Sequence, residues 1–75
     1  MSSTREFTAV IEREGDVYVA LCPELDIASQ GATAEEARTN LVEALELFFE
    51  TASPEELRLR ARGEVIVTRV AVRVA

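Results

Sequence analysis

The chain has 75 residues, 48% of them hydrophobic, and its 14 acidic and 8 basic side chains give a net charge of −6. One domain is the natural reading of this length, and the acidic balance argues against direct nucleic-acid binding, which depends on neutralising phosphates with Lys and Arg. A single cysteine, no histidine and no apolar run of roughly 20 residues indicate a cytoplasmic protein with no metal, no cofactor and no membrane span.

The first predicted unit is a β-hairpin over residues 7–21, in which apolar residues recur with a period of two. The apolar positions that we place on the core face are Phe7, Ala9, Ile11, Val17, Val19 and Leu21. Residues 14–16 (EGD) form the turn, with Gly15 free to take positive φ. A three-residue loop pairs Arg13 with Val17, whereas a two-residue turn places Tyr18 beside Ile11. We favour the three-residue loop because it makes one face uniformly apolar.

A short third strand and a long helix are predicted next. Pro23 ends the second strand because it cannot donate to a ladder, and residues 27–30 form a short third strand closed by Gly31. Thr33 with Glu36 three residues later is the capping box of a helix. At about 100° per residue, one apolar stripe of this helix faces the sheet. The stripe consists of Ala34, Ala37, Leu41, Ala44, Leu45, Phe48 and Ala52.

Two further faces of this helix carry predictions about partners. Val42, Leu47 and Phe49 widen the apolar stripe beyond what one small sheet covers, which indicates a subunit contact. Glu43, Glu46 and Glu50 lie on the opposite face. A row of glutamates on a helix is more often a solubilising surface, but here it is also a candidate contact for a basic partner.

A second, two-turn helix and a final strand complete the predicted order. Ser53 at the cap and Pro54 at the first helical position begin the helix, and Gly63 follows it. Residues 64–75 are rich in β-branched side chains and predict a long strand. The expected fold class is α+β, with one main helix packed on a small, mostly antiparallel sheet in the order β-β-(β)-α-α-β.

Residues able to support catalysis are scarce. The carboxylates near strand ends and loops could hold magnesium for phosphodiester hydrolysis, but solvated turn residues are the more common meaning. They are Glu12, Glu14, Asp16, Glu24 and Asp26. Cys22 has no histidine to activate it and reads as a packed strand cysteine. Arg69 and Arg73 either grip a partner carboxylate or protect an exposed strand edge. We therefore expect no enzymatic activity.

The run at residues 18–25 (YVALCPEL), followed by residues 28–31 (ASQG) and 33–37 (TAEEA), closely resembles the HicB-type antitoxins and their stand-alone relatives. The helix at residues 40–47 and the segment 53–56 (SPEE) carry the same resemblance, which covers almost the whole chain. It implies a degenerate ribonuclease-H-like fold without a working nuclease site. Many of these antitoxins carry a C-terminal DNA-binding domain, which would begin where this chain stops at Ala75, so we expect residues 1–75 to be a single HicB-like domain without it.

The function that the resemblance implies is neutralisation of a HicA-type toxin, a small basic ribonuclease that cleaves messenger RNA. The alternative is a stand-alone oligomeric HicB-like module with no toxin and no DNA-binding role. The candidate partner-binding residues are Glu24, Asp26, Glu43, Glu46 and Glu50. We also expect a homodimer or higher oligomer in which terminal strands join across a two-fold axis. Its candidate interface residues are Val42, Leu47, Phe49, Val70, Val72 and Val74.

Overall fold

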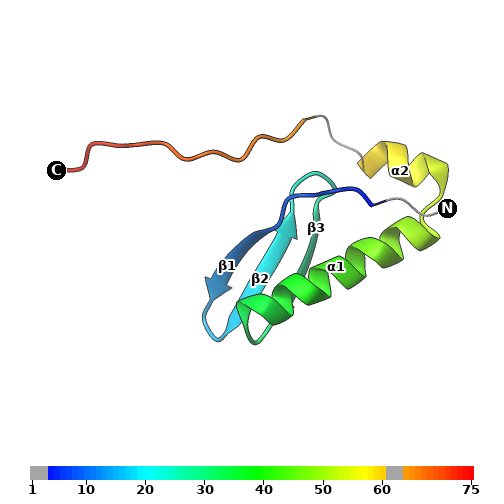
Figure 1. The fold of residues 1–75 in the computed structure, drawn as a ribbon, viewed down its shortest axis with the longest axis horizontal. Coiled ribbons are helices and arrows are strands. Elements are labelled where there is room, and N and C mark those ends of the chain that lie inside the picture. The colour runs from blue at the N-terminus through cyan, green and yellow to red at the C-terminus, as the bar shows by residue number, and fades with distance from the viewer. Residues whose placement is uncertain (1–3, 61–63) are drawn as a thin grey trace.

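The computed structural model describes residues 4–60 and 64–75, and it has the expected α+β architecture. Three strands form an antiparallel sheet in the order β1-β2-β3, and one long helix packs across it (Figure 1). The elements are β1 (Val10–Glu14), β2 (Val17–Cys22), β3 (Ile27–Gly31), α1 (Ala34–Thr51) and α2 (Pro54–Arg60).

The β1–β2 hairpin has a two-residue turn, so the three-residue loop predicted from the sequence is wrong. Glu14 pairs with Val17 and Arg13 pairs with Tyr18, which leaves only Gly15 and Asp16 between the strands. Gly15 has φ +61°, a conformation that costs glycine nothing and that begins a type II′ turn. The side chain of Arg13 donates to the Gly15 carbonyl at 3.1 Å. This tight turn sets the register of the whole sheet.

The observed register places the other face of β2, not the predicted one, in the core. Because side chains alternate along a strand, a slip of one residue exchanges the two faces. Ala20 and Cys22 are buried, with Tyr18 packed beside them, whereas Val17, Val19 and Leu21 lie on the opposite face. Our assignment of the β2 core face was therefore wrong, and the predicted core residue Ala9 is exposed, although Phe7 and Ile11 do pack against the core.

The third strand forms as expected, antiparallel to β2, with Cys22 paired with Ile27. The connection is the four-residue loop 23–26, in which Pro23 follows the end of β2. Asp26 closes the loop with φ 55°, a left-handed conformation that aspartate tolerates better than most residues.

Helix α1 begins with the predicted capping box. The Glu36 N–H donates to Thr33 Oγ1 at 3.0 Å, and the Glu36 carboxylate accepts from the Ala32 N–H at 3.3 Å. The first bond satisfies a backbone donor that the first turn of a helix leaves unpaired, and the second satisfies the N–H of the residue before the cap. The Asn40 side chain then donates to the Gln30 carbonyl at 2.8 Å, which ties the helix to the β3 edge.

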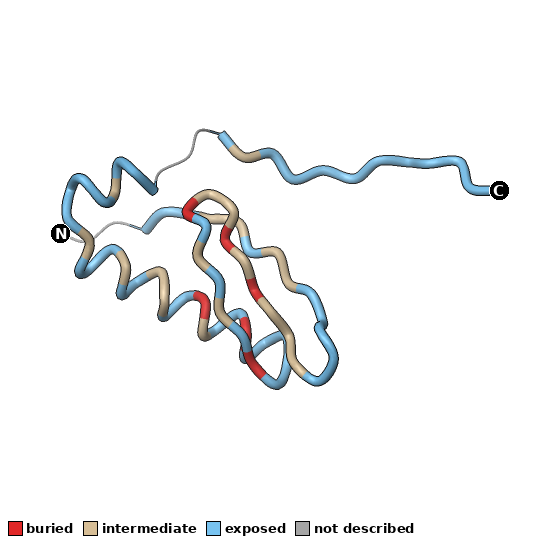
Figure 2. The backbone as a smooth tube through the Cα atoms, turned by 180° about the vertical axis from the view of Figure 1, so that it is seen from behind, coloured by how far each residue is buried: buried red, intermediate tan, exposed pale blue. Residues whose placement is uncertain are grey.

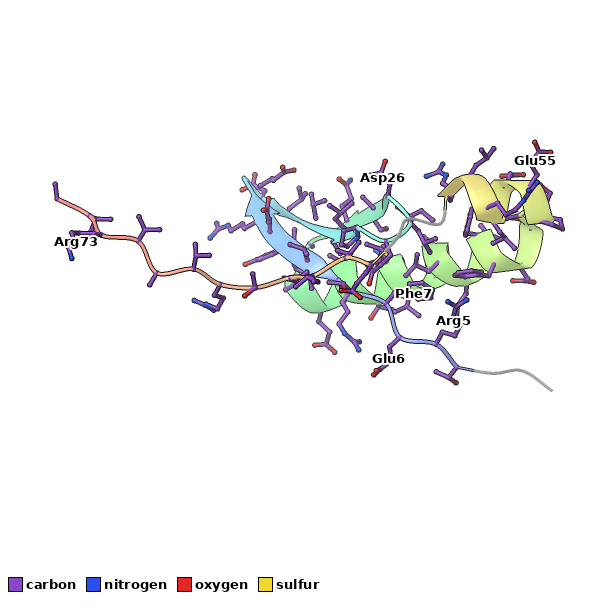
Figure 3. All side chains as sticks on the ribbon, turned by 90° about the horizontal axis from the view of Figure 1, so that it is seen from above. Arg5, Glu6, Phe7, Asp26, Glu55 and Arg73 are labelled. Carbon is purple, nitrogen blue, oxygen red and sulfur yellow. The ribbon has the colours of Figure 1, made fainter. Side chains whose placement is uncertain are left out.

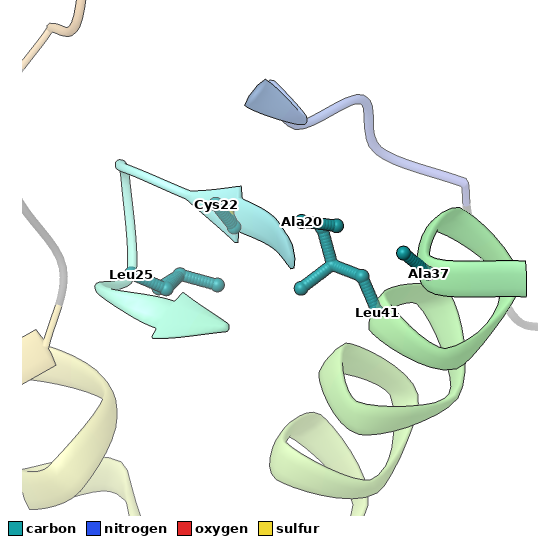
Figure 4. Close-up of a cluster of buried hydrophobic side chains, with 5 residues drawn as sticks. All are labelled: Ala20, Cys22, Leu25, Ala37 and Leu41. Atoms are coloured by element: carbon teal, nitrogen blue, oxygen red, sulfur yellow. The ribbon is translucent and has the colours of Figure 1, made fainter. Parts of the chain in front are cut away.

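The core lies where α1 crosses the sheet, and three of its five buried side chains are small (Figures 2 and 4). They are Ala20, Cys22, Leu25, Ala37 and Leu41. Small residues let the helix approach closely. At Gly31, a Cβ atom would lie only 2.7 Å from the backbone nitrogen of Ala37.

The chain after α1 matches the prediction only in part. Helix α2 has the expected two turns, and Ser53 Oγ accepts from the Glu56 N–H at 3.1 Å. Gly63, expected to follow α2, lies outside the described residues. Residues 64–75 are extended but form no strand, contrary to the expected final β element. A strand needs a neighbouring strand for its backbone hydrogen bonds, and in the described parts of this chain the sheet contains only β1, β2 and β3.

Candidate functional site

A clasp between Thr8 and Glu24 holds the segment before β1 against the β2–β3 loop. One Glu24 carboxylate oxygen accepts from the Thr8 hydroxyl at 2.8 Å and from the Thr8 N–H at 2.9 Å, and the other oxygen lies 3.1 Å from the same N–H. The Cys22 thiol donates to this carboxylate over 3.5 Å. The sequence-predicted partner-binding residue Glu24 is therefore engaged within the molecule.

The pKa values of both the Glu24 carboxyl and the Cys22 thiol are shifted. Burial acts to raise the pKa of Glu24, but the hydrogen bonds from Thr8 and from the loop backbone outweigh it, so this pKa lies below its ordinary value. Burial raises the pKa of the Cys22 thiol, and the bond to Glu24 together with its negative charge adds to the effect. Cys22 is fully buried and packs as a core side chain.

An open cleft of about 310 Å³ lies beside the clasp. It is lined by Arg5, Glu6, Phe7, Glu24, Leu25, Phe49 and Leu57. The rings of Phe7 and Phe49 pack with centroids 5.5 Å apart. The Arg5 guanidinium lies 5.6 Å from the centre of the Phe7 ring, and Figure 3 labels both of these residues. Phe49, predicted as an oligomer contact, thus supports the N-terminal segment while remaining 40% exposed.

We expect Glu24→Gln to lower the free energy of unfolding by about 1 kcal/mol at pH 7, because bonds to a charged acceptor are lost from a half-buried, partly screened site. A depressed folded-state pKa stabilises the fold fully above the ordinary glutamate pKa, and this stabilisation is lost as pH falls through the folded value. The difference between wild type and variant should therefore shrink towards pH 3 in urea titrations.

The exposed Glu46→Gln serves as the control for Glu24→Gln, with an expected change within about 0.5 kcal/mol at both pH values. Equal effects of the two substitutions at pH 7 would contradict a stabilising clasp.

The three helix glutamates lie where the sequence predicts, on the exposed side of α1. Glu43, Glu46 and Glu50 are all exposed, and Val42 and Leu47 border them with 42% and 59% of their surface accessible. We name these five residues the acidic stripe. At about 100° per residue, the stripe occupies an arc opposite the buried positions of the helix. It is thus an exposed, charged surface on the side of α1 away from the sheet.

Asp26, the other predicted loop contact, does not join this surface. It lies in the β2–β3 loop and is exposed, and it has an interaction partner within the fold. The Arg60 guanidinium donates to the carbonyls of Asp26 at 3.1 Å and Leu25 at 3.3 Å, which attaches α2 to the loop. The loop and helix residues therefore do not form one acidic site.

Sequence reasoning missed an apolar strip on the sheet face opposite α1. Val10, Leu21 and Ala28 lie opposite one another on the three strands. Val19 and Val17 extend this apolar strip along β2. A shallow groove of about 250 Å³ runs here, edged by the carboxylates of Glu12 and Glu14. The signal was present as the second alternating set of β2, but the predicted register assigned that set to the core.

Comparisons of the chain with models of known protein families, with curated proteins and with solved structures find no match. The structure itself defines the class, a small α+β domain with one long helix layered on a three-stranded antiparallel sheet. The resemblance to the HicB-type antitoxins stays a prediction.

The described residues were also compared with the patterns of a metal site and of a membrane-spanning helix. Within residues 4–60 and 64–75, no three His, Cys, Asp or Glu side chains gather in a way that suits a metal ion. No helix in those ranges is long and apolar enough to cross a membrane.

Proposed function

We propose that this chain is a HicB-like antitoxin, a non-catalytic protein that binds and neutralises a small basic HicA-type toxin. The observation that carries the proposal is the acidic stripe on α1, which is exposed and free of the packing that holds the other face of the helix. A net charge of −6 adds long-range attraction for a basic partner.

The composition of the acidic stripe suits a protein partner. Val42 and Leu47 offer apolar area to desolvate, and the three glutamates between and beside them offer carboxylates for Lys and Arg side chains. Complementary charges mainly speed the encounter and select the partner, whereas the apolar contacts slow dissociation. The sheet holds α1 rigidly, so the stripe is organised before binding.

A second candidate function is a stand-alone oligomeric HicB-like module with no toxin and no DNA-binding role. The exposed apolar residues at 64–75 favour it, because such a segment fits self-association better than contact with a basic toxin. Co-expression with a small basic protein, if one is encoded beside this gene, separates the two functions. Rescue of growth together with a purified complex supports the antitoxin, and absence of both leaves the oligomeric module.

We expect the double variant E43K/E46K to associate with a HicA-type toxin on the order of tenfold more slowly at low salt. Its association rate should also depend less on salt, because the steering charge has been reversed. Both positions are exposed, so stability should change by only about 0.5 kcal/mol. Stopped-flow association over a range of salt concentrations measures the effect.

The control is D16K/E64K, which makes the same change in net charge at two exposed positions away from α1. Equal slowing by the two double variants would assign the effect to overall charge. Unchanged association in E43K/E46K would mean that the glutamates serve solubility alone.

A further inference from the structure

Residues 64–75, which we name the C-terminal arm, leave the body of the fold as an extended chain. Figures 1 and 3 both show the arm projecting beyond the end of the β1–β2 hairpin. Its branched apolar side chains are largely exposed, from 61% to 83% of their surface. They are Ile66, Val67, Val70, Val72 and Val74. An extended β-branched segment of this kind requires a covering surface, or it becomes an aggregation hazard.

The sheet offers a free edge at β1. Among the described residues, β1 has a neighbouring strand on one side only, where β2 lies. The other edge, β3, is partly occupied, because the Gln30 carbonyl accepts from the Asn40 amide of α1. Backbone groups on an open edge readily pair with another extended chain.

We propose that the C-terminal arm of a second copy of this chain adds to β1 as a fourth strand. The two faces of the arm match the two faces of β1. Even-numbered arm residues, which include Val70 and Val72, would lie on the same sheet face as Ile11 and extend the apolar surface that packs against α1. Odd-numbered residues place Arg69 on the outer face, where β1 carries Glu12 and Glu14. Arg73, labelled in Figure 3, shares that face of the arm but would lie beyond the start of β1 at Val10.

The side chains favour an antiparallel register with Glu12 opposite Arg69. This register sets Val70 opposite Ile11 and Thr68 opposite Arg13. Opposite charges and apolar pairs directly across a ladder stabilise it. A parallel arrangement that sets Arg73 opposite Glu12 instead places Val74 against Arg13.

A second copy is the occupant because the arm makes no ladder with its own β1 and its end lies beyond its own sheet. Direct pairing of two arms is less favourable, since each arm offers only one carboxylate, Glu64, to Arg69 and Arg73, whereas β1 offers Glu12 and Glu14. Reciprocal exchange across a two-fold axis closes both β1 edges at once. It also buries in each copy the apolar side chains that the single chain leaves exposed.

The first test is the mass in solution of the full chain at micromolar concentration. Light scattering should give twice the chain mass of 8.3 kDa for the wild type and the single-chain mass for V70E/V72E. Both substituted positions are more than 70% exposed, so each copy should keep its fold by circular dichroism. The matched control V42E/L47E, on the exposed side of α1, should remain a dimer. A monomeric wild type, or a dimer that V70E/V72E leaves intact, overturns the proposal.

Cysteine pairs test the register and the source of the arm. Under mild oxidation, E12C/R69C should form a disulfide between two chains, which runs at twice the chain mass on a non-reducing gel. E12C/R73C should not, because four strand positions separate the cysteines from the expected pairing, about 13 Å, beyond disulfide reach. The native Cys22 is buried and is kept in all variants. A disulfide within one chain, or stronger cross-linking by E12C/R73C, overturns the proposal.

Discussion

Replacing Gly31 by alanine should lower the free energy of unfolding by about 3 kcal/mol, the cost of overpacking a closely packed site. A Cβ atom at this position would lie 2.7 Å from the Ala37 nitrogen and 2.9 Å from the backbone carbon of Glu36. These atoms belong to the first turn of α1, so relief requires the whole helix to shift from the sheet. In a domain this small, the melting temperature should fall by more than 10 °C. Thermal and urea unfolding measure the change.

Gly15→Ala is the matched control for Gly31→Ala. Its Cβ atom would meet nothing within 4 Å, and only the positive φ of +61° penalises it, by about 1 kcal/mol. If Gly31→Ala costs no more than Gly15→Ala, the close approach of α1 to β3 is wrong.

Leu41→Ala should cost about 3 kcal/mol, because it removes buried methyl groups and leaves a cavity between α1 and the sheet. Leu41 is only 2% exposed and belongs to the central cluster with Ala20 and Ala37 (Figure 4). Domains of this size have a total stability of roughly 4–11 kcal/mol, so one such loss is a large fraction of it. Urea unfolding monitored by circular dichroism measures the difference.

Leu47→Ala removes the same atoms from the same helix, but Leu47 is 59% exposed. Its expected effect on unfolding is within about 0.5 kcal/mol. Similar losses for the two substitutions would contradict the placement of the core on the Leu41 face of α1.

Local chemistry made much of the fold predictable. The caps at Thr33 and Ser53 and the loop at Pro23 depend on contacts within a few residues, and each forms as predicted. The helix stripe at Ala37 and Leu41 follows from a 3.6-residue period that the neighbouring chain cannot alter. The α+β class follows from these elements together.

The hairpin register was not predictable by the same means. Both faces of β2 are apolar, so alternation alone did not show which one meets the helix. The tight turn at Gly15 and the small size of Ala20 and Cys22 decide it, because α1 approaches that face closely. Our prediction consequently assigned Val19 and Leu21 to the core, although they lie on the sheet face opposite α1.

The candidate site residues also fall into two groups, those placed by local sequence and those placed by tertiary contacts. The exposed positions of Glu43, Glu46 and Glu50 follow from their place on one helix, and the sequence by itself determined them. The role of Glu24 depends on Thr8, 16 residues earlier, and only the tertiary structure brought the two together. Periodicity and capping act along a few residues of chain, whereas pairing register, helix approach and the partners of a loop carboxylate depend on segments distant in sequence. The sequence therefore determined the elements and their exposed faces, and the tertiary structure decided which β2 face is the core and which acidic residues remain on the surface.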